Sequence, residues 1–181
     1  MEAQKVLRER RSIRNFKNEK IDRSIIKDII ETTTYAPTWT NSQPMRYTVI
    51  ENELIKSKIA EQCFEGFASN VKITNRSAGI IVLTYVNGLS GRSPLGQIIS
   101  SKGDSWSMFD SGVAANQLAL AAHDRGVATV IIGAFDEKKV EQIINIPEGE
   151  VVAALIAYGI EESHPNAPKR KTLDEIARFI D

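Results

Sequence analysis

The sequence contains few of the residues on which covalent or metal-based chemistry depends. Cys63 is the only cysteine, and His123 and His164 are the only histidines. A single cysteine excludes an internal disulfide and any zinc or iron-sulfur site built on several thiolates. There is also no HExxH motif and no glycine-rich phosphate loop. We therefore predict no metal site and no catalytic side chain, and any demanding chemistry is expected to belong to a bound cofactor.

Net charge and long apolar runs are absent as well. The 181 residues include 23 Lys plus Arg and 23 Asp plus Glu, so no overall field draws the protein to nucleic acid or to an anionic membrane. No apolar stretch is long enough to span a membrane, and residues 1–14 are too polar for a secretory signal. We expect a cytoplasmic protein that binds neither nucleic acid nor membranes, in which any anion site is local.

The isolated histidines and the cysteine are expected to have structural roles. His123 falls within a predicted helix and His164 within a proline-containing loop, and neither has a partner that would make it a base or a ligand. Cys63 has no cationic neighbour in the sequence that would favour its thiolate. The sequence therefore predicts a buried, inert thiol.

Apolar periodicity predicts one domain, residues 1–181, in which helices and strands alternate. This alternation indicates a sheet with helices packed against it rather than a helical bundle. Residues 87–103 are rich in Gly, Ser and Pro and are expected to form a loop or cover. The predicted strands are residues 47–50, 79–86, 128–132 and 151–158, and the predicted helices are residues 2–9, 22–36, 54–67, 105–124, one beginning at Asp136, and a short helix or extended arm from Thr172.

Two basic clusters near opposite ends of the chain could hold a phosphate. The first consists of Arg10, Arg11, Ser12 and Arg14, and the second is the run 169–171, which includes Lys169 and Arg170. Guanidinium groups and a hydroxyl suit a phosphate dianion because they donate several charge-assisted hydrogen bonds. Each cluster taken alone is equally typical of a solvated surface.

Two further segments could meet the polar edge of a ring-shaped ligand. One is a proline-bounded loop that contains Thr38, Asn41, Ser42 and Gln43, although such residues are also common in ordinary turns. The other is Gly133, which follows an apolar strand and would let a backbone amide approach a ligand closely. An ordinary glycine at a strand end is an equally good interpretation.

Taken together and in order, these segments resemble the FMN-dependent nitroreductase superfamily over nearly the whole chain. The resemblance implies an α+β fold with a central, mostly antiparallel sheet flanked by helices, and a homodimer with domain-swapped arms and FMN at the interface. Five segments carry it: Arg-Arg-Ser-Ile-Arg-Asn-Phe at 10–16, Ala-Pro-Thr-Trp-Thr-Asn-Ser-Gln-Pro at 36–44, Asp-Ser-Gly-Val-Ala-Ala-Asn-Gln-Leu at 110–118, Ile-Gly-Ala-Phe-Asp at 132–136 and Arg-Lys-Thr-Leu-Asp-Glu-Ile at 170–176.

The resemblance also implies roles for individual residues. Arg10, Arg11, Ser12 and Arg14 would contact the FMN phosphate and ribityl chain, with Arg170 and the adjacent Lys169 closing over the phosphate. The backbone at Gly133 and Ala134 would face the reactive N5 edge, and Asn70 and Lys72 are candidates for the pyrimidine edge, one residue closer together than in relatives. The partner subunit would contribute Pro37, Thr38, Trp39, Asn41 and Gln43.

The activity that the resemblance implies is FMN-dependent oxidoreduction. NADH or NADPH would deliver a hydride, and a nitroaromatic, quinone or similar small acceptor would leave with the electrons in a ping-pong sequence. Bulky Trp39 and the Gly133-Ala134 pair depart from many relatives and predict a narrower pocket. Two alternatives remain open: a flavin-binding or flavin-processing protein without reductase turnover, and a module in which the same arginines hold a nucleic-acid backbone.

Overall fold

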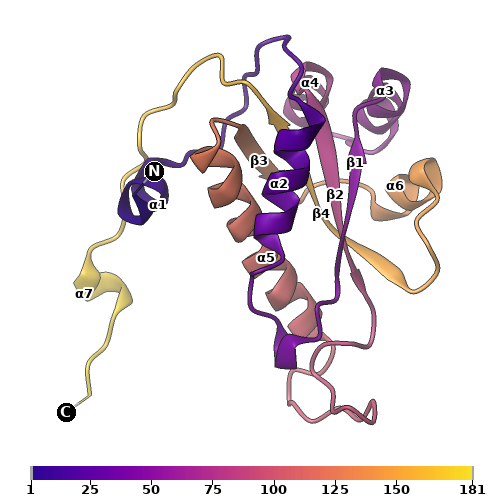
Figure 1. Ribbon diagram of the computed structural model, residues 1–181, viewed down its shortest axis with the longest axis vertical. Coiled ribbons are helices and arrows are strands. Elements are labelled where there is room, and N and C mark those ends of the chain that lie inside the picture. Colours follow the sequence, from indigo (N-terminus) through magenta and orange to yellow (C-terminus); the bar gives the residue numbers. More distant parts are fainter. Residues whose placement is uncertain (1, 181) are drawn as a thin grey trace.

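An antiparallel sheet forms the centre of the structure (Figure 1). The computed structural model describes residues 2–180, and within them the four strands lie in the order β1-β2-β4-β3, with each neighbouring pair antiparallel. This arrangement confirms the predicted α+β class with a sheet flanked by helices. The strands are β1 (Met45–Ile50), β2 (Gly79–Val86), β3 (Ala128–Ile132) and β4 (Glu150–Gly159).

Both faces of the sheet are buried, which explains the continuous apolar run in β2. Side chains alternate between faces along a strand, so Ile80 and Val82 belong to one core cluster while Ile81 and Leu83 belong to the other. All four are almost completely buried. A strand that is buried on both sides requires helices on both sides.

One face is covered by α2 (Arg23–Thr33) and α5 (Ser105–Asp124), which run alongside each other in Figure 1. The carboxylate of Asp22 accepts a hydrogen bond from the Ser24 amide and caps α2 as predicted. Gly126 follows α5 with a φ of 73°, the left-handed conformation that favours glycine at this position. These caps fix the start of α2 and the end of α5.

The other face is covered by α3 (Glu53–Gln62), α4 (Ala68–Arg76) and α6 (Glu137–Ile144). The prediction of one helix over residues 54–67 was wrong at its end. The chain leaves α3 at Cys63 and turns through Gly66, which has a φ of 79°, before α4 begins. No pattern in the sequence predicted α4 as a separate helix.

The ends of the chain lie to one side of the sheet. Figure 1 shows α1 (Ala3–Glu9) beside one end of α5, and the C-terminal segment crossing past α1 and leading away to α7 (Leu173–Ile176). Thr172 and Glu175 form the predicted capping box at the start of α7. Almost every described residue after Glu161 is exposed, so this arm makes little contact with the rest of its own chain.

Candidate functional site

The N-terminal basic segment is extended and attached to the edge of the sheet. Ser12 forms a parallel bridge with Thr129, and the Ile13 amide donates a hydrogen bond to the Thr129 carbonyl at 3.0 Å. The side chain of Ile13 is buried in the core. Because this apolar residue fixes the middle of the segment, the arginines on either side of it are held at the surface next to β3.

Residues from the two ends of the chain meet in one pocket of about 380 Å³. The predicted residues Arg10, Arg11, Ser12, Arg14 and Arg170 all line it, whereas Lys169 does not. The remaining lining comes from the C-terminal arm. The complete lining is Arg10, Arg11, Ser12, Arg14, Pro165, Asn166, Pro168 and Arg170.

This arginine pocket is strongly cationic. No carboxylate lines it, and none of its four arginines forms an ion pair within residues 2–180. Burial lowers the pKa of Arg10, and the nearby guanidinium groups of Arg11 and Arg170 lower it further. The Nε atom of Arg11 is buried and has no hydrogen-bond partner among the described residues. The guanidinium groups therefore repel one another, and a bound anion would relieve that repulsion.

A second predicted group, the loop from Thr38 to Gln43, has an unusual backbone. Thr40, Asn41 and Gln43 have φ values of 45°, 57° and 46°, a region that residues with a Cβ seldom adopt. The backbone N–H of Gln43 donates to the Thr38 hydroxyl at 3.1 Å, which closes the loop around the short 3-10 helix η1 (Trp39–Asn41). Such conformations persist only where surrounding contacts impose them, and they concentrate at functional sites.

Asp110 supplies those contacts and was missed as a site residue by the sequence analysis. Its carboxylate, 2% exposed on α5, accepts the backbone N–H of Trp39 at 3.1 and 3.2 Å and the hydroxyl of Ser90 at 2.6 Å. The indole N–H of Trp39 donates to the Arg92 carbonyl at 2.9 Å. A carboxylate on the buried side of α5, beside Ser107 and Ser111, was the signal that could have indicated this role.

The third predicted group lies where β3 ends. The side-chain amide of Asn70, on α4, donates to the Ala134 carbonyl at 3.1 Å and so holds the segment that contains Gly133 and Ala134. Lys72 lies two residues further along α4, about 200° around the helix axis from Asn70. It is exposed. The structure thus places Asn70 against the segment that contains Gly133 and Ala134, and it does not place Lys72 beside Asn70.

The arginine pocket and the loop of residues 38–43 lie near opposite ends of α5. His123, near the end of α5, shares a pocket of about 230 Å³ with Arg10 and Arg11, whereas Asp110, near its start, holds Trp39. At about 1.5 Å rise per residue these positions are separated by about 20 Å along α5. Figure 1 shows α1 near one end of α5 and the loop that precedes β1 near the other end.

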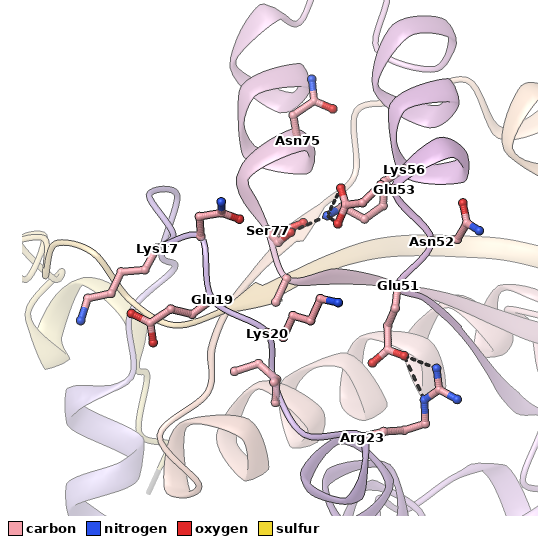
Figure 2. A pocket seen from close by; sticks show the side chains of 13 residues that line it. Lys17, Glu19, Lys20, Arg23, Glu51, Asn52, Glu53, Lys56, Asn75 and Ser77 are labelled. Atoms are coloured by element: carbon pink, nitrogen blue, oxygen red, sulfur yellow. Dashed lines mark hydrogen bonds and ion pairs between the residues drawn. The ribbon is translucent and has the colours of Figure 1, made fainter.

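A separate pocket of about 550 Å³ contains none of the predicted site residues (Figure 2). Four of its charged groups are paired with one another: Arg23 contacts Glu51, and the buried Lys56 ammonium donates to both carboxylate oxygens of Glu53 and to the Ser77 carbonyl at 2.6 Å. The Lys56 contacts join the start of α3 to the chain just after α4. We therefore interpret these pairs as structural.

The remaining reactive groups are consistent with passive roles. Cys63 is buried, and burial together with the Asp136 carboxylate raises the pKa of its thiol to about 11, so the thiol stays protonated at neutral pH. Among residues 2–180 there is no cluster of three or more His, Cys, Asp or Glu suited to a metal ion. Within the same residues, no helix is both long and apolar enough to cross a membrane.

Comparison with known proteins gives consistent matches. The model of a family described as "Nitroreductase family" matches residues 7–160. A Bacillus subtilis (strain 168) protein, provisionally named an NAD(P)H nitroreductase, is 27% identical over 173 residues, which cover 91% of this chain and 87% of that protein.

Solved structures match over almost the full length. A nitroreductase family protein from Clostridium novyi NT has a TM-score of 0.79 and 28% identity, covering 97% of this chain and 91% of that chain. A protein of Exiguobacterium sibiricum 255-15, provisionally named a nitroreductase and solved in complex with FMN, has a TM-score of 0.83 and 22% identity, covering 99% and 98%.

Proposed function

The chain belongs to the nitroreductase family, and on that premise we propose that it is an FMN-dependent oxidoreductase that works as a homodimer. We further propose that residues 1–181 form a single FMN-binding domain and that NADH or NADPH is its electron donor. The observation that carries the proposal is the arginine pocket, where arginines from both ends of the chain line one space and form no ion pair among the described residues.

The arginine pocket fits the phosphate group of FMN. A phosphate carries up to two negative charges and three acceptor oxygens, and the pocket offers the guanidinium groups of Arg10, Arg11, Arg14 and Arg170 with the hydroxyl of Ser12. Arginine forks match phosphate oxygens in geometry as well as in charge. Burial lowers the pKa of Arg10, and the neighbouring guanidinium groups of Arg11 and Arg170 lower it further, so an anion bound among them would be stabilised.

The segment after β3 is proposed to hold the ring. Gly133 is exposed, and a Cβ built on it would meet no atom within 4 Å, so the backbone there is open to a flat ligand. Asn70 fixes the neighbouring carbonyl of Ala134 and leaves the rest of its own amide free to meet the polar edge of a ring. Backbone and amide groups are suited to orienting a flavin without taking part in its chemistry.

The loop from Pro37 to Gln43 is proposed to complete the site of a second copy. Asp110, which holds Trp39, and His123, which shares a pocket with Arg10 and Arg11, are about 20 Å apart along α5, and this separation supports a site to which two chains contribute. The C-terminal arm supports association because it exposes large apolar side chains with no covering in its own chain. These are Leu173, Ile176, Phe179 and Ile180, which are 62%, 68%, 81% and 89% exposed.

Bound FMN would supply the redox chemistry, accepting a hydride from NADH or NADPH and returning electrons to a small acceptor such as a nitroaromatic or a quinone. The residues of this chain bind and orient. The arginines anchor the phosphate, Asn70 and the Gly133 backbone position the ring, and the strained loop keeps its shape because Asp110 holds Trp39. No side-chain acid or base is required for this role.

The test is to purify the protein, record its absorption spectrum and titrate it with FMN before adding any electron acceptor. We expect a yellow protein that binds one FMN per chain and oxidises NAD(P)H when a quinone is supplied. FMN binding without NAD(P)H oxidation would instead support a flavin-binding or flavin-processing role. A colourless protein that refuses micromolar FMN and binds nucleic acid in a salt-dependent way would contradict the proposal.

A further inference from the structure

The chain turns where β2 ends, and Asn87 and Gly88 form the turn. No other asparagine in the sequence is followed by a glycine. Gly88 has a φ of 80°, a backbone conformation that favours glycine. A Cβ built on it would meet only the Nε of Arg92, at 3.9 Å. The backbone nitrogen after Asn87 therefore belongs to the least hindered kind of residue, in an open part of the surface.

The side-chain amide of Asn87 and the backbone N–H of Gly88 are both free of hydrogen bonds within residues 2–180. Asn87 is also exposed. The preceding backbone, in contrast, is held: the Val86 N–H donates to the Pro44 carbonyl at 2.9 Å, and the Asn87 N–H donates to the Gly149 carbonyl at 2.8 Å. The Asn87 amide and the Gly88 nitrogen can therefore approach each other without giving up a hydrogen bond.

We propose that Asn87 is a site of spontaneous deamidation. The Gly88 nitrogen attacks Cγ of Asn87, so that an N–Cγ bond forms and the Cγ–Nδ2 bond breaks. The proton lost by the Gly88 nitrogen leaves with the amide group as ammonia. The product is a succinimide, a cyclic imide that joins residues 87 and 88. Because the deprotonated nitrogen is the nucleophile, alkaline solution accelerates the reaction.

Water then opens the imide at either of its carbonyl carbons. When the bond between the nitrogen and Cγ breaks, the product is aspartate on the original backbone. When the bond between the nitrogen and the backbone carbonyl carbon breaks, the product is isoaspartate, in which the chain continues through Cβ and Cγ. The overall change consumes a water molecule and releases ammonia, and no oxidant or reductant takes part.

The two products have different effects on the fold. Aspartate adds a negative charge and leaves every backbone atom in place. Isoaspartate places an additional carbon in the backbone, directly after the N–H groups that hold the end of β2 to Pro44 and Gly149. Isoaspartate therefore weakens the joint between β2, the loop that precedes β1 and the turn before β4, and it lowers the Tm of the protein.

Incubation in water enriched in heavy oxygen tests the site directly. The whole chain is kept in this water at mildly alkaline pH, then unfolded and digested in ordinary water at mildly acidic pH, so that only oxygen added during the incubation is heavy. Trypsin releases residues 77–92 as one peptide, in which Asn87 is the only residue with a side-chain amide. Mass spectrometry measures the labelled fraction, and chromatography separates the aspartate form from the isoaspartate form.

Asn18 is the internal comparison. It is exposed, lies outside the helices and strands, and its side chain forms no hydrogen bond within the described chain. It is followed, however, by Glu19, whose N–H donates to the Lys17 carbonyl at 2.9 Å. We expect Asn87 to acquire heavy oxygen at least roughly tenfold faster than Asn18. Labelling of Asn87 that is no faster than that of Asn18 would overturn the inference.

Variants at Asn87 separate the modification from its effect on the fold. Asn87→Gln keeps an amide but requires a larger ring, so it should remain unlabelled and keep its Tm during the incubation. Asn87→Asp, measured when freshly prepared, supplies the charge alone and should have the Tm of fresh wild-type protein. Incubated wild-type protein should have a lower Tm, in proportion to its isoaspartate content. A Tm that does not change as isoaspartate accumulates would overturn the effect on the joint.

Discussion

The side-chain amide of Asn70 donates a hydrogen bond to the backbone carbonyl of Ala134 at a distance of 3.1 Å. The two residues are far apart in the sequence, and the contact joins α4 to the segment after β3. A helix is a rigid support, so this bond gives a loop that follows the edge strand β3 a fixed position beside the sheet. The proposed ring-binding segment is therefore held by a helix that the sequence analysis did not predict.

Replacement of Asn70 by Ala should loosen this segment. We expect the free energy of unfolding to fall by about 1 kcal/mol, because one hydrogen bond is lost, and the rate of flavin reduction by NADH to fall. Chemical denaturation and stopped-flow absorbance measure the two effects. Asn75→Ala is the control, since Asn75 is exposed on the same helix and its side chain makes no hydrogen bond within the described chain. Equal behaviour of both variants would remove the role given to Asn70.

Replacement of Arg170 by Gln should weaken FMN binding without weakening the fold. We expect Kd for FMN to rise roughly 10- to 100-fold, because a charge-assisted hydrogen bond to the phosphate is lost. The Tm of the FMN-free protein should not fall, since the change relieves repulsion between Arg170 and Arg10. Lys169→Gln, which alters a neighbouring cation outside the pocket, should leave Kd unchanged. Titration by flavin fluorescence measures these constants.

Replacement of Lys56 by Met should destabilise the protein by about 1–3 kcal/mol. The Lys56 ammonium is buried and donates to the Ser77 carbonyl, which would be left without that partner in the variant. Lys58→Met is the matched control, because Lys58 lies on the same helix and is exposed. Urea denaturation measures both. A variant as stable as the control would show that the pairs in Figure 2 contribute little to the fold.

The stability of the fold should fall with pH below about 6.5 because of His123. Burial lowers the pKa of His123 below its ordinary value of 6.5; Arg10 and His164 lower it further, while the carboxylates of Glu9 and Glu161 oppose the shift. The unfolded chain therefore binds the proton more readily, and acid favours unfolding. The stability that the neutral His123 contributes is fully present above pH 6.5 and is lost as the pH falls through the lowered pKa of the folded state.

His123→Gln should reduce this dependence. Denaturation curves recorded between pH 5 and 7.5 should show a shallower loss of stability in the variant than in the wild type. His164→Gln is the comparison, since His164 is an exposed residue whose ring contacts Glu161. Parallel pH profiles for the wild type and His123→Gln would contradict the expected effect of burying this imidazole.

Elements with strong local signals could be predicted from the sequence. The apolar run 79–86, the long periodic stretch 105–124 and the caps at Asp22 and Asp136 gave the correct strand, helix and helix starts. The helix α4 gave no comparable signal: it begins after Phe67, which cannot cap with its side chain, and it buries only Ile73 and Thr74 among its residues. Its existence depends on packing against the sheet, which the local sequence does not record.

The site divides in the same way. The arginines could be found because their chemistry is visible in the sequence, and the structure brings Arg10 and Arg170 to one pocket. The role of Asp110 depends on Trp39, which lies far from it in the sequence. The left-handed backbone at Thr40 could not be predicted either, because this conformation usually indicates glycine and the residue is a threonine. The separation of the pocket from the loop also required the fold, because the length of α5 sets it.

The most direct test of the shared site is a mixed dimer. One chain carries Arg170→Gln and the other carries Asn41→Ala with Gln43→Ala, so that each homodimer has two defective FMN sites and the mixed dimer has one intact site. Differently tagged chains allow the mixed dimer to be isolated, and bound FMN is counted by absorbance. The account predicts that tight binding returns to half of the sites, one FMN per mixed dimer. Mixed dimers that bind FMN no better than the two parents, or a wild-type monomer that holds FMN tightly, would contradict it.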